Sequence, residues 1–146
     1  MHRHVLLEAG SVAIVTLNRP AQKNAIGPQL RKELAAVLHH IRADDAVRAV
    51  VLAGSGGAFC AGTDVKEWLA ADAPAQARIK ASNSDVIDLW RDLGKPTVAA
   101  VDGPAFGLGF LLALRSDLVV ATGRASFAMP ERKLGITVPD ADDWHT

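Results

Sequence analysis

Two glycine-rich loops hold the residues of this sequence that are best placed to do chemistry. The first, GSGGAFCAGTD, spans residues 54–64, and the second, DGPAFGLG, spans residues 102–109; each follows a short apolar run. Each loop can present backbone N–H groups at the start of a helix, where the helix dipole adds partial positive charge. N–H groups aimed at one point form an oxyanion hole. The loops therefore favour chemistry in which negative charge develops on a carbonyl oxygen.

Three familiar motifs do not fit these loops. Gly107-Leu108-Gly109 begins a dinucleotide-binding fingerprint, but Leu112 stands at the third glycine position. The first loop has no Gly-Lys-Ser or Gly-Lys-Thr, which a nucleotide phosphate-binding loop requires. Neither loop has the Gly-x-Ser-x-Gly pattern that exposes a nucleophilic serine. The sequence therefore disfavours both nucleotide binding through these motifs and serine hydrolysis.

Two pairs of histidines offer no complete metal site. His39 and His40 are adjacent, so on a helix their side chains would point about 100° apart. His2 and His4 can share one face of a strand, but no nearby Cys, Asp or further His completes a ligand set. We therefore expect no metal ion, with His39 and His40 at the surface.

Composition and charge disfavour several classes of partner. The 16 Lys and Arg residues balance the 16 Asp and Glu residues, so no basic field suggests a nucleic-acid partner. The single cysteine, Cys60, cannot form an internal disulfide, which fits a reducing compartment. The longest apolar runs fall far short of the roughly 20 residues of a membrane helix. We expect a cytoplasmic protein with neither a nucleic-acid nor a membrane partner.

Short apolar runs alternate along the chain with stretches in which apolar residues recur at helical spacing. A turn with glycine joins the first two runs, as in a β-hairpin. The order of strands and helices predicts an α/β fold with a largely parallel sheet, whose ligands gather at the loops after the carboxyl ends of its strands. The expected strands are residues 5–8, 12–17, 49–53 and 97–101, and the expected helices are residues 28–41 and 74–93.

Four sequence blocks follow one another over nearly the whole chain. They are LNRPAQKNAI, GAFCAGTDVKEW, KPTVAAVDGPAFGLG and SDLVVATGRASFAMPERKLGI. In order and spacing they resemble the enoyl-CoA hydratase/isomerase family, also called the crotonase family. The resemblance implies a crotonase-like spiral of ββα units that binds acyl-CoA thioesters. The coenzyme A thioester would be the substrate, no separate cofactor is implied, and two backbone N–H groups would stabilise a thioester enolate.

The resemblance also assigns roles to individual residues. The two N–H groups would belong to Thr63 and Leu108; the family usually has glycine at the second position, but only the backbone is needed there. The segments that hold the adenine and phosphates of coenzyme A in the family match positions near residues 23–25 and 61–65. The coenzyme A contacts implied in this way are Lys23, Ala25, Ala61, Asp64 and Val65.

The family's hydratases use two glutamates, because adding water to a conjugated double bond requires one group to position the water and another to manage the proton. The first position is Leu111 here, in an exposed-looking turn that also carries Phe110 and Leu112, and the second is Glu131. A single base beside an oxyanion hole can still move a proton between two carbons. The pattern therefore resembles the isomerase branch, and an apolar pocket around Glu131 would raise its pKa.

Some of these residues also have structural explanations. Asp64 can cap a helix that starts near Val65. Cys60 stands where the family often has a small residue, which favours packing over nucleophilic chemistry. Asp117 is interpreted as structural. By its residue type alone, Glu131 would be a solvated loop acid, and only the surrounding blocks favour a catalytic role.

The last residues depart from the family pattern. Pro139 comes one residue later after Gly135 than the family spacing predicts, and DADDWHT stands where glycines would follow. In the family, later helices close the acyl pocket and build trimers or hexamers. We expect residues 1–146 to form one crotonase-like core domain without that region. A homo-oligomer is a possible partner state, although the missing region weighs against the family's trimer or hexamer. Two interpretations stay open: an isomerase that uses Glu131, or a non-catalytic remnant that binds acyl-CoA or a partner subunit.

Overall fold

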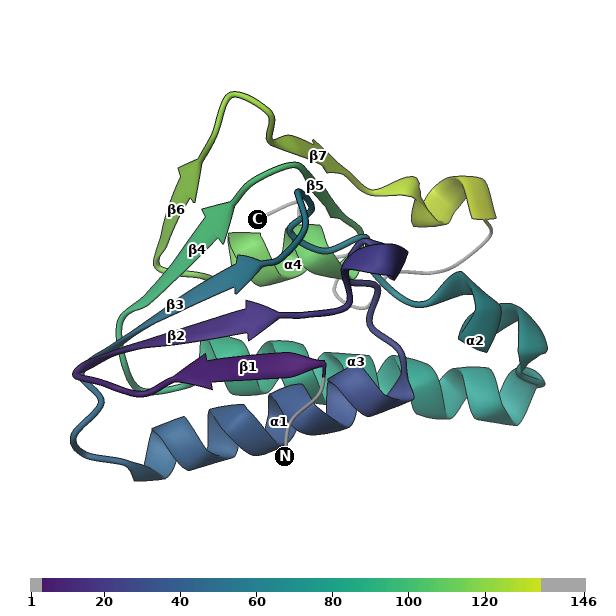
Figure 1. Ribbon diagram of the computed structural model, residues 1–146. Coiled ribbons are helices and arrows are strands. Elements are labelled where there is room, and N and C mark those ends of the chain that lie inside the picture. Colours follow the sequence, from purple (N-terminus) through teal and green to yellow (C-terminus); the bar gives the residue numbers. More distant parts are fainter. Residues whose placement is uncertain (1–3, 135–146) are drawn as a thin grey trace, which may run out of the picture.

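The computed structural model describes residues 4–134, which form a mixed five-stranded sheet with helices packed against it (Figure 1). The strand order is β1-β2-β3-β4-β6. The first two strands form the expected antiparallel hairpin, and the following pairs are all parallel. The strands are β1 (Val5–Glu8), β2 (Val12–Leu17), β3 (Ala49–Gly54), β4 (Thr97–Val101) and β6 (Leu118–Ala121).

Two long helices, α1 (Pro28–Ala43) and α3 (Ala73–Arg91), lie side by side on one side of the sheet (Figure 1). Each has a proline in its first turn, where the missing N–H costs no hydrogen bond. Asp72 caps α3 by accepting a hydrogen bond from Ala75 N at 2.9 Å, so the helix begins one residue earlier than the sequence predicts. Among the helices of residues 4–134, none has the length and hydropathy of a membrane span.

The core lies between the sheet and these helices. The apolar residues that recur at helical spacing in α1 are buried, and so are Val86 and Leu89 of α3, where Trp90 is fully enclosed. The indole N–H of Trp90 reaches Leu112 O and Ser116 Oγ, each at 3.0 Å. In β3 only Val50 and Leu52 are buried, because successive strand side chains point to opposite faces and only one face packs on the helices.

The two glycine-rich loops leave the sheet side by side, because β3 and β4 are parallel neighbours. The second loop contains a short strand that the sequence did not predict, β5 (Pro104–Phe106), paired in parallel with β7 (Ser126–Ala128). Cys60 of the first loop bridges to Ala105 of β5, and Phe106 N donates to Cys60 O at 2.9 Å. Two short helices then follow the loops, α2 (Val65–Ala70) and α4 (Leu108–Leu114).

Two further short helices complete the described part, η1 (Pro20–Gln22) and η2 (Pro130–Leu134). Asp117, between α4 and β6, accepts a hydrogen bond from Thr97 N at 2.8 Å, and its own N–H reaches Thr97 Oγ1 at 3.0 Å. This pair joins the start of β4 to the start of β6, which confirms the structural interpretation of Asp117. The predicted departures at Gly135 and Pro139 lie outside the described residues, as does His2.

Candidate active site

The first glycine-rich loop is docked against the segment that follows β2. Ala61 N donates to Lys23 O at 2.9 Å, Ile26 N donates to Gly62 O at 2.7 Å, and Asp64 N donates to Ile26 O at 3.1 Å. Residues about 40 positions apart are therefore held together by backbone hydrogen bonds. This brings the predicted coenzyme A contacts from the two segments into one neighbourhood around Thr63.

Asn24 helps to hold the first glycine-rich loop against the segment that follows β2. It is fully buried and adopts a left-handed backbone with φ of 57°, which asparagine tolerates better than most residues. Its side-chain amide donates to Ser55 O at 3.0 Å and Ala58 O at 2.9 Å, and its oxygen accepts from Arg19 N at 2.7 Å. Asn24 therefore ties the segment after β2 to the beginning of the first loop.

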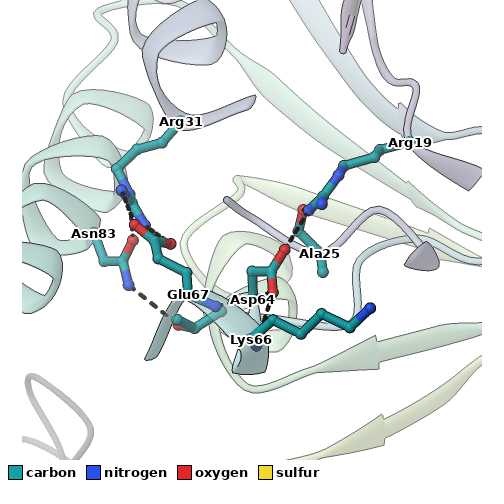
Figure 2. Close-up of polar contacts among 8 residues, drawn as sticks. Arg19, Ala25, Arg31, Asp64, Lys66, Glu67 and Asn83 are labelled. Carbon is teal, nitrogen blue, oxygen red and sulfur yellow. Dashed lines mark hydrogen bonds and ion pairs between the residues drawn. The ribbon is translucent and has the colours of Figure 1, made fainter. Parts of the chain in front are cut away.

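Asp64 begins α2 as an N-cap. Its Oδ1 accepts hydrogen bonds from Lys66 N at 2.9 Å and Glu67 N at 3.3 Å, and its Oδ2 accepts one from Arg19 Nη1 at 2.7 Å (Figure 2). Burial by itself would raise the pKa of Asp64, but Arg19 and the two N–H groups outweigh it and hold that pKa below its ordinary value. The predicted capping role of Asp64 is thus confirmed, and both side-chain oxygens are occupied.

Gly107 opens α4 at a point where a side chain would collide with the carboxyl group of Glu131. Its φ is +54°, and its N–H donates to Ala128 O at 2.8 Å. A β-carbon placed on Gly107 would lie 1.6 Å from Glu131 Oε1. The Glu131 carboxyl group therefore occupies the space that any other residue at position 107 would fill. This places the carboxyl beside the first turn of α4, directly before Leu108.

The two loops meet at Gly62 and the start of α4. A β-carbon built on Gly62, where φ is +99°, would lie 2.8 Å from Phe106 O and 3.5 Å from Leu108 N. Thr63 follows Gly62 directly, so the two N–H groups predicted to form the oxyanion hole lie in adjoining segments. Within residues 4–134, neither Thr63 N–H nor Leu108 N–H donates a hydrogen bond. As far as the described part of the chain is concerned, a ligand oxygen could accept from both.

Glu131 is a half-buried acid in η2. Its Oε2 is enclosed and has no hydrogen-bond partner among the described residues. Burial raises the pKa of Glu131, in the direction predicted for an apolar pocket, although its own backbone N–H acts in the opposite sense. Glu131 is therefore not a fully solvated loop acid. A carboxyl group with a raised pKa is suited to both accepting and returning a proton.

The turn of α4 that looked exposed in the sequence is buried. Leu111 is only 3% exposed and Leu112 is fully enclosed, because this face of α4 packs into the hydrophobic core. Leu111 N donates to Gly107 O at 3.0 Å, as in a regular first helical turn. Position 111 thus contributes an apolar side chain to the interior, one helical turn after Gly107, the residue against which the Glu131 carboxyl lies.

Cys60 packs against the opposite side of the same helix. A β-carbon on Gly109 would lie 2.2 Å from Cys60 O, so α4 approaches the first loop closely only because residue 109 is glycine. Cys60 is fully buried, and burial raises the pKa of its thiol to about 12, although a hydrogen bond with Gly62 acts in the opposite sense. The predicted packing role of Cys60 is confirmed.

Comparison with known proteins identifies this arrangement. The sequence model described as "Enoyl-CoA hydratase/isomerase" matches residues 8–144. The chain belongs to this family. A mevalonyl-coenzyme A hydratase of Beauveria bassiana is 41% identical over 135 residues, covering 86% of this chain and 48% of that protein. A carnitinyl-CoA dehydratase of Proteus mirabilis is 39% identical over 137 residues, covering 93% of this chain and 51% of that protein.

Solved structures agree with the sequence relatives. An enoyl-CoA hydratase/isomerase from Xanthobacter autotrophicus superposes with a TM-score of 0.90 at 34% identity, covering 94% of this chain and 53% of that one. The fold is therefore the predicted crotonase fold. The chain spans about half the length of the enoyl-CoA hydratase/isomerase relatives it matches.

The other residues predicted to contact coenzyme A differ in how exposed they are. Lys23 and Val65 are exposed, whereas Ala25 and Ala61 are partly buried. His39 and His40 lie at the surface, as predicted. In residues 4–134, no three His, Cys, Asp or Glu side chains group together as metal ligands would.

Sequence reasoning missed a second group of polar residues beside Thr63, namely Arg31, Glu67 and Asn83. Asn83 is 5% exposed and lies on the face of α3 that also carries Ile79 and Trp90. A polar residue at a core-facing helical position was the available signal for it. The signal for Glu67 was its place three residues after the cap Asp64, although its side chain binds Arg31 instead of closing a capping box.

Proposed function

We propose that this chain binds an enoyl-CoA thioester and moves its double bond, with Glu131 as the single proton carrier. The observation that carries the proposal is the position of the Glu131 carboxyl group against Gly107, immediately before Leu108 N–H. An acid with a raised pKa thereby lies next to an N–H, at the start of α4, that has no acceptor among residues 4–134. Membership of the enoyl-CoA hydratase/isomerase family supports an acyl-CoA substrate.

The reaction requires one proton transfer in each direction. Thr63 N–H and Leu108 N–H would donate to the thioester oxygen of a 3-enoyl-CoA, which makes the protons on C2 more acidic. The Glu131 carboxylate would remove one C2 proton, leaving a dienolate whose negative charge rests on that oxygen. Protonated Glu131 would then return the proton to C4, and the double bond would move to C2–C3 as the enolate collapses. No water and no redox partner enter the balance.

Hydration is the second candidate, because relatives 41% and 39% identical are named a hydratase and a dehydratase. Adding water requires a group that positions the water as well as one that manages the proton. Position 111 supplies an apolar, 3% exposed leucine instead of a second carboxyl group. Residues 4–134 therefore favour the double-bond shift over hydration.

Turnover of a 3-enoyl-CoA in deuterated water tests the proposal. Formation of the conjugated 2-enoyl-CoA is followed by its ultraviolet absorbance, and mass spectrometry counts any deuterium that protonated Glu131 takes from the solvent before it returns the proton to C4. Glu131→Gln keeps the size of the side chain but cannot take a proton, so we expect it to abolish both signals while calorimetry still detects acyl-CoA binding. Glu8→Gln, at an exposed site on β1, is the matched control and should keep the native rate.

Each other outcome identifies a different error. Saturable binding by the native chain without formation of the 2-enoyl-CoA would support the non-catalytic alternative. Formation of a 3-hydroxyacyl-CoA would support hydration. Unchanged turnover by Glu131→Gln would show that another group is the base.

A further inference from the structure

A series of hydrogen-bonded, largely buried side chains, called the polar chain below, connects Thr63 to three helices. Asn83 of α3 donates from Nδ2 to Thr63 Oγ1 at 3.1 Å and accepts at Oδ1 from Arg31 Nε of α1 at 2.8 Å. Arg31 in turn binds Glu67 of α2 through two contacts, Nη1 to Oε1 at 3.2 Å and Nη2 to Oε2 at 2.9 Å (Figure 2). One end of this chain of hydrogen bonds is thus the residue whose N–H is proposed to hold the thioester oxygen.

The direction of every link is determined by chemistry. A guanidinium group has donors and no acceptor, so Arg31 requires the oxygen of Asn83 and leaves the amide nitrogen to face Thr63. The fork of Arg31 matches the two oxygens of Glu67, which limits rotation of the guanidinium plane. The side-chain exposures of Arg31 and Glu67 are only 11% and 17%, so water competes weakly for these contacts. Asn83 therefore has one favoured orientation.

The Asn83 contact adds a side-chain anchor to the backbone around Thr63. Gly62 O and Thr63 N–H belong to one planar peptide group and point in opposite directions. Because Gly62 O accepts from Ile26 N, Thr63 N–H points away from Ile26. Gly62, at φ of +99°, has the conformational freedom of glycine, although backbone hydrogen bonds to Ile26 hold the peptide groups on both sides of Thr63. The Asn83 contact adds a further hold through the Thr63 side chain and limits the remaining tilt.

We infer that Asn83 is a positioning residue for the Thr63 N–H, held in its orientation by Arg31 and Glu67; this inference rests on the proposed function. Asn83 itself need not touch the substrate. An apolar side chain at position 83 would extend the apolar face formed by Ile79 and Trp90, so burial alone does not account for an amide there. Its contact with Thr63 does.

Two substitutions test the link from its two ends. Asn83→Leu removes both hydrogen bonds of the amide at similar volume, and Thr63→Val replaces only the hydroxyl by a methyl group. We expect each to lower kcat by about tenfold to a hundredfold, because a small misplacement of a reacting or binding group has effects of that size. The double variant should be no slower than the slower single variant, since both changes break one link.

The carbonyl stretch of a bound acyl-CoA, labelled with carbon-13 at the thioester, separates positioning from stability. Donation to the carbonyl oxygen lowers the stretching frequency, so the native chain should show a downward shift on binding. In Asn83→Leu and Thr63→Val the frequency should move back towards that of the free thioester, while affinity for coenzyme A alone stays unchanged. Val86→Ala, a buried change on the same helix outside the polar chain, should lower the melting temperature without moving the frequency.

The outcomes separate this inference from the proposed function. A native chain that binds acyl-CoA without a frequency shift, or does not bind it, would overturn both. A native shift and a Glu131-dependent turnover that persist unchanged in Thr63→Val would overturn the role of Asn83 alone, even if Asn83→Leu does not fold. Multiplicative losses in the double variant would also overturn it, because Asn83 would then act by another route.

Discussion

Gly107→Ala should separate the catalytic position of Glu131 from the stability of the fold. The added β-carbon would lie 1.6 Å from Glu131 Oε1 and 2.6 Å from Glu131 Cδ. Ordinary van der Waals contact begins at 3.4 Å, so the carboxyl oxygen must retreat by about 1.8 Å, the difference between 3.4 and 1.6 Å. The carboxyl is the far end of a flexible side chain and can rotate away, so the clash displaces the acid without breaking the backbone.

The two effects of Gly107→Ala differ in size. The positive φ of +54° becomes strained in alanine, at a cost of about 1–3 kcal/mol. For a chain of this length that lowers the melting temperature by roughly 2–12 °C. Misplacement of a catalytic group by 1 Å can cost about a hundredfold in rate. We therefore expect a folded protein whose isomerisation rate has fallen by about a hundredfold or more.

Gly94→Ala is the matched control. Gly94 also has a positive φ, +80°, but a β-carbon there would meet nothing within 4 Å. Circular dichroism should show a similar loss of melting temperature in both variants, whereas only Gly107→Ala should lose turnover of 3-enoyl-CoA. The reasoning fails if Gly107→Ala keeps more than a tenth of the native rate, or if Gly94→Ala loses as much rate as Gly107→Ala.

Three further predictions follow from the ionisation and burial of single residues. Burial raises the pKa of Glu131, so native turnover should fall as the pH drops through that raised value. Stability from its protonated form should be full below its ordinary pKa of 4.5 and lost as the pH rises through the raised one, and Glu131→Gln should remove this pH dependence from unfolding titrations. Asp64→Ala removes a helix cap and the partner of Arg19, so urea unfolding at pH 7 should show a free energy of unfolding lower by about 1–3 kcal/mol. Because the native pKa of Asp64 is lowered, the difference from the native chain should shrink as the pH falls through that pKa. A difference that stays constant with pH would contradict the ion pair. Cys60 is buried with its pKa raised to about 12, so an aromatic disulfide reagent should label it only as the protein opens, and rapid labelling without denaturant would refute its packing role.

Local patterns along the chain predicted most of the fold. The hairpin, the helices near residues 28–41 and 74–93, and the strands near residues 49–53 and 97–101 are all present, with ends displaced by at most two residues. These elements repeat apolar residues at the period of a strand or a helix, which is visible without knowledge of any neighbour. The three-residue strand β5 was missed because it is too short to show a period and exists through pairing with β7.

The sequence by itself determined which residue types are available at the site: two glycine loops, Glu131, and an apolar residue at position 111. The tertiary structure decided that Gly62 touches the start of α4, that the Glu131 carboxyl group fills the space at Gly107, and that Leu111 faces the core. It also joined Arg31, Glu67 and Asn83 to Thr63. These contacts join segments about 20 to 50 residues apart, and their distances depend on how parallel strands and packed helices align, which no local pattern specifies.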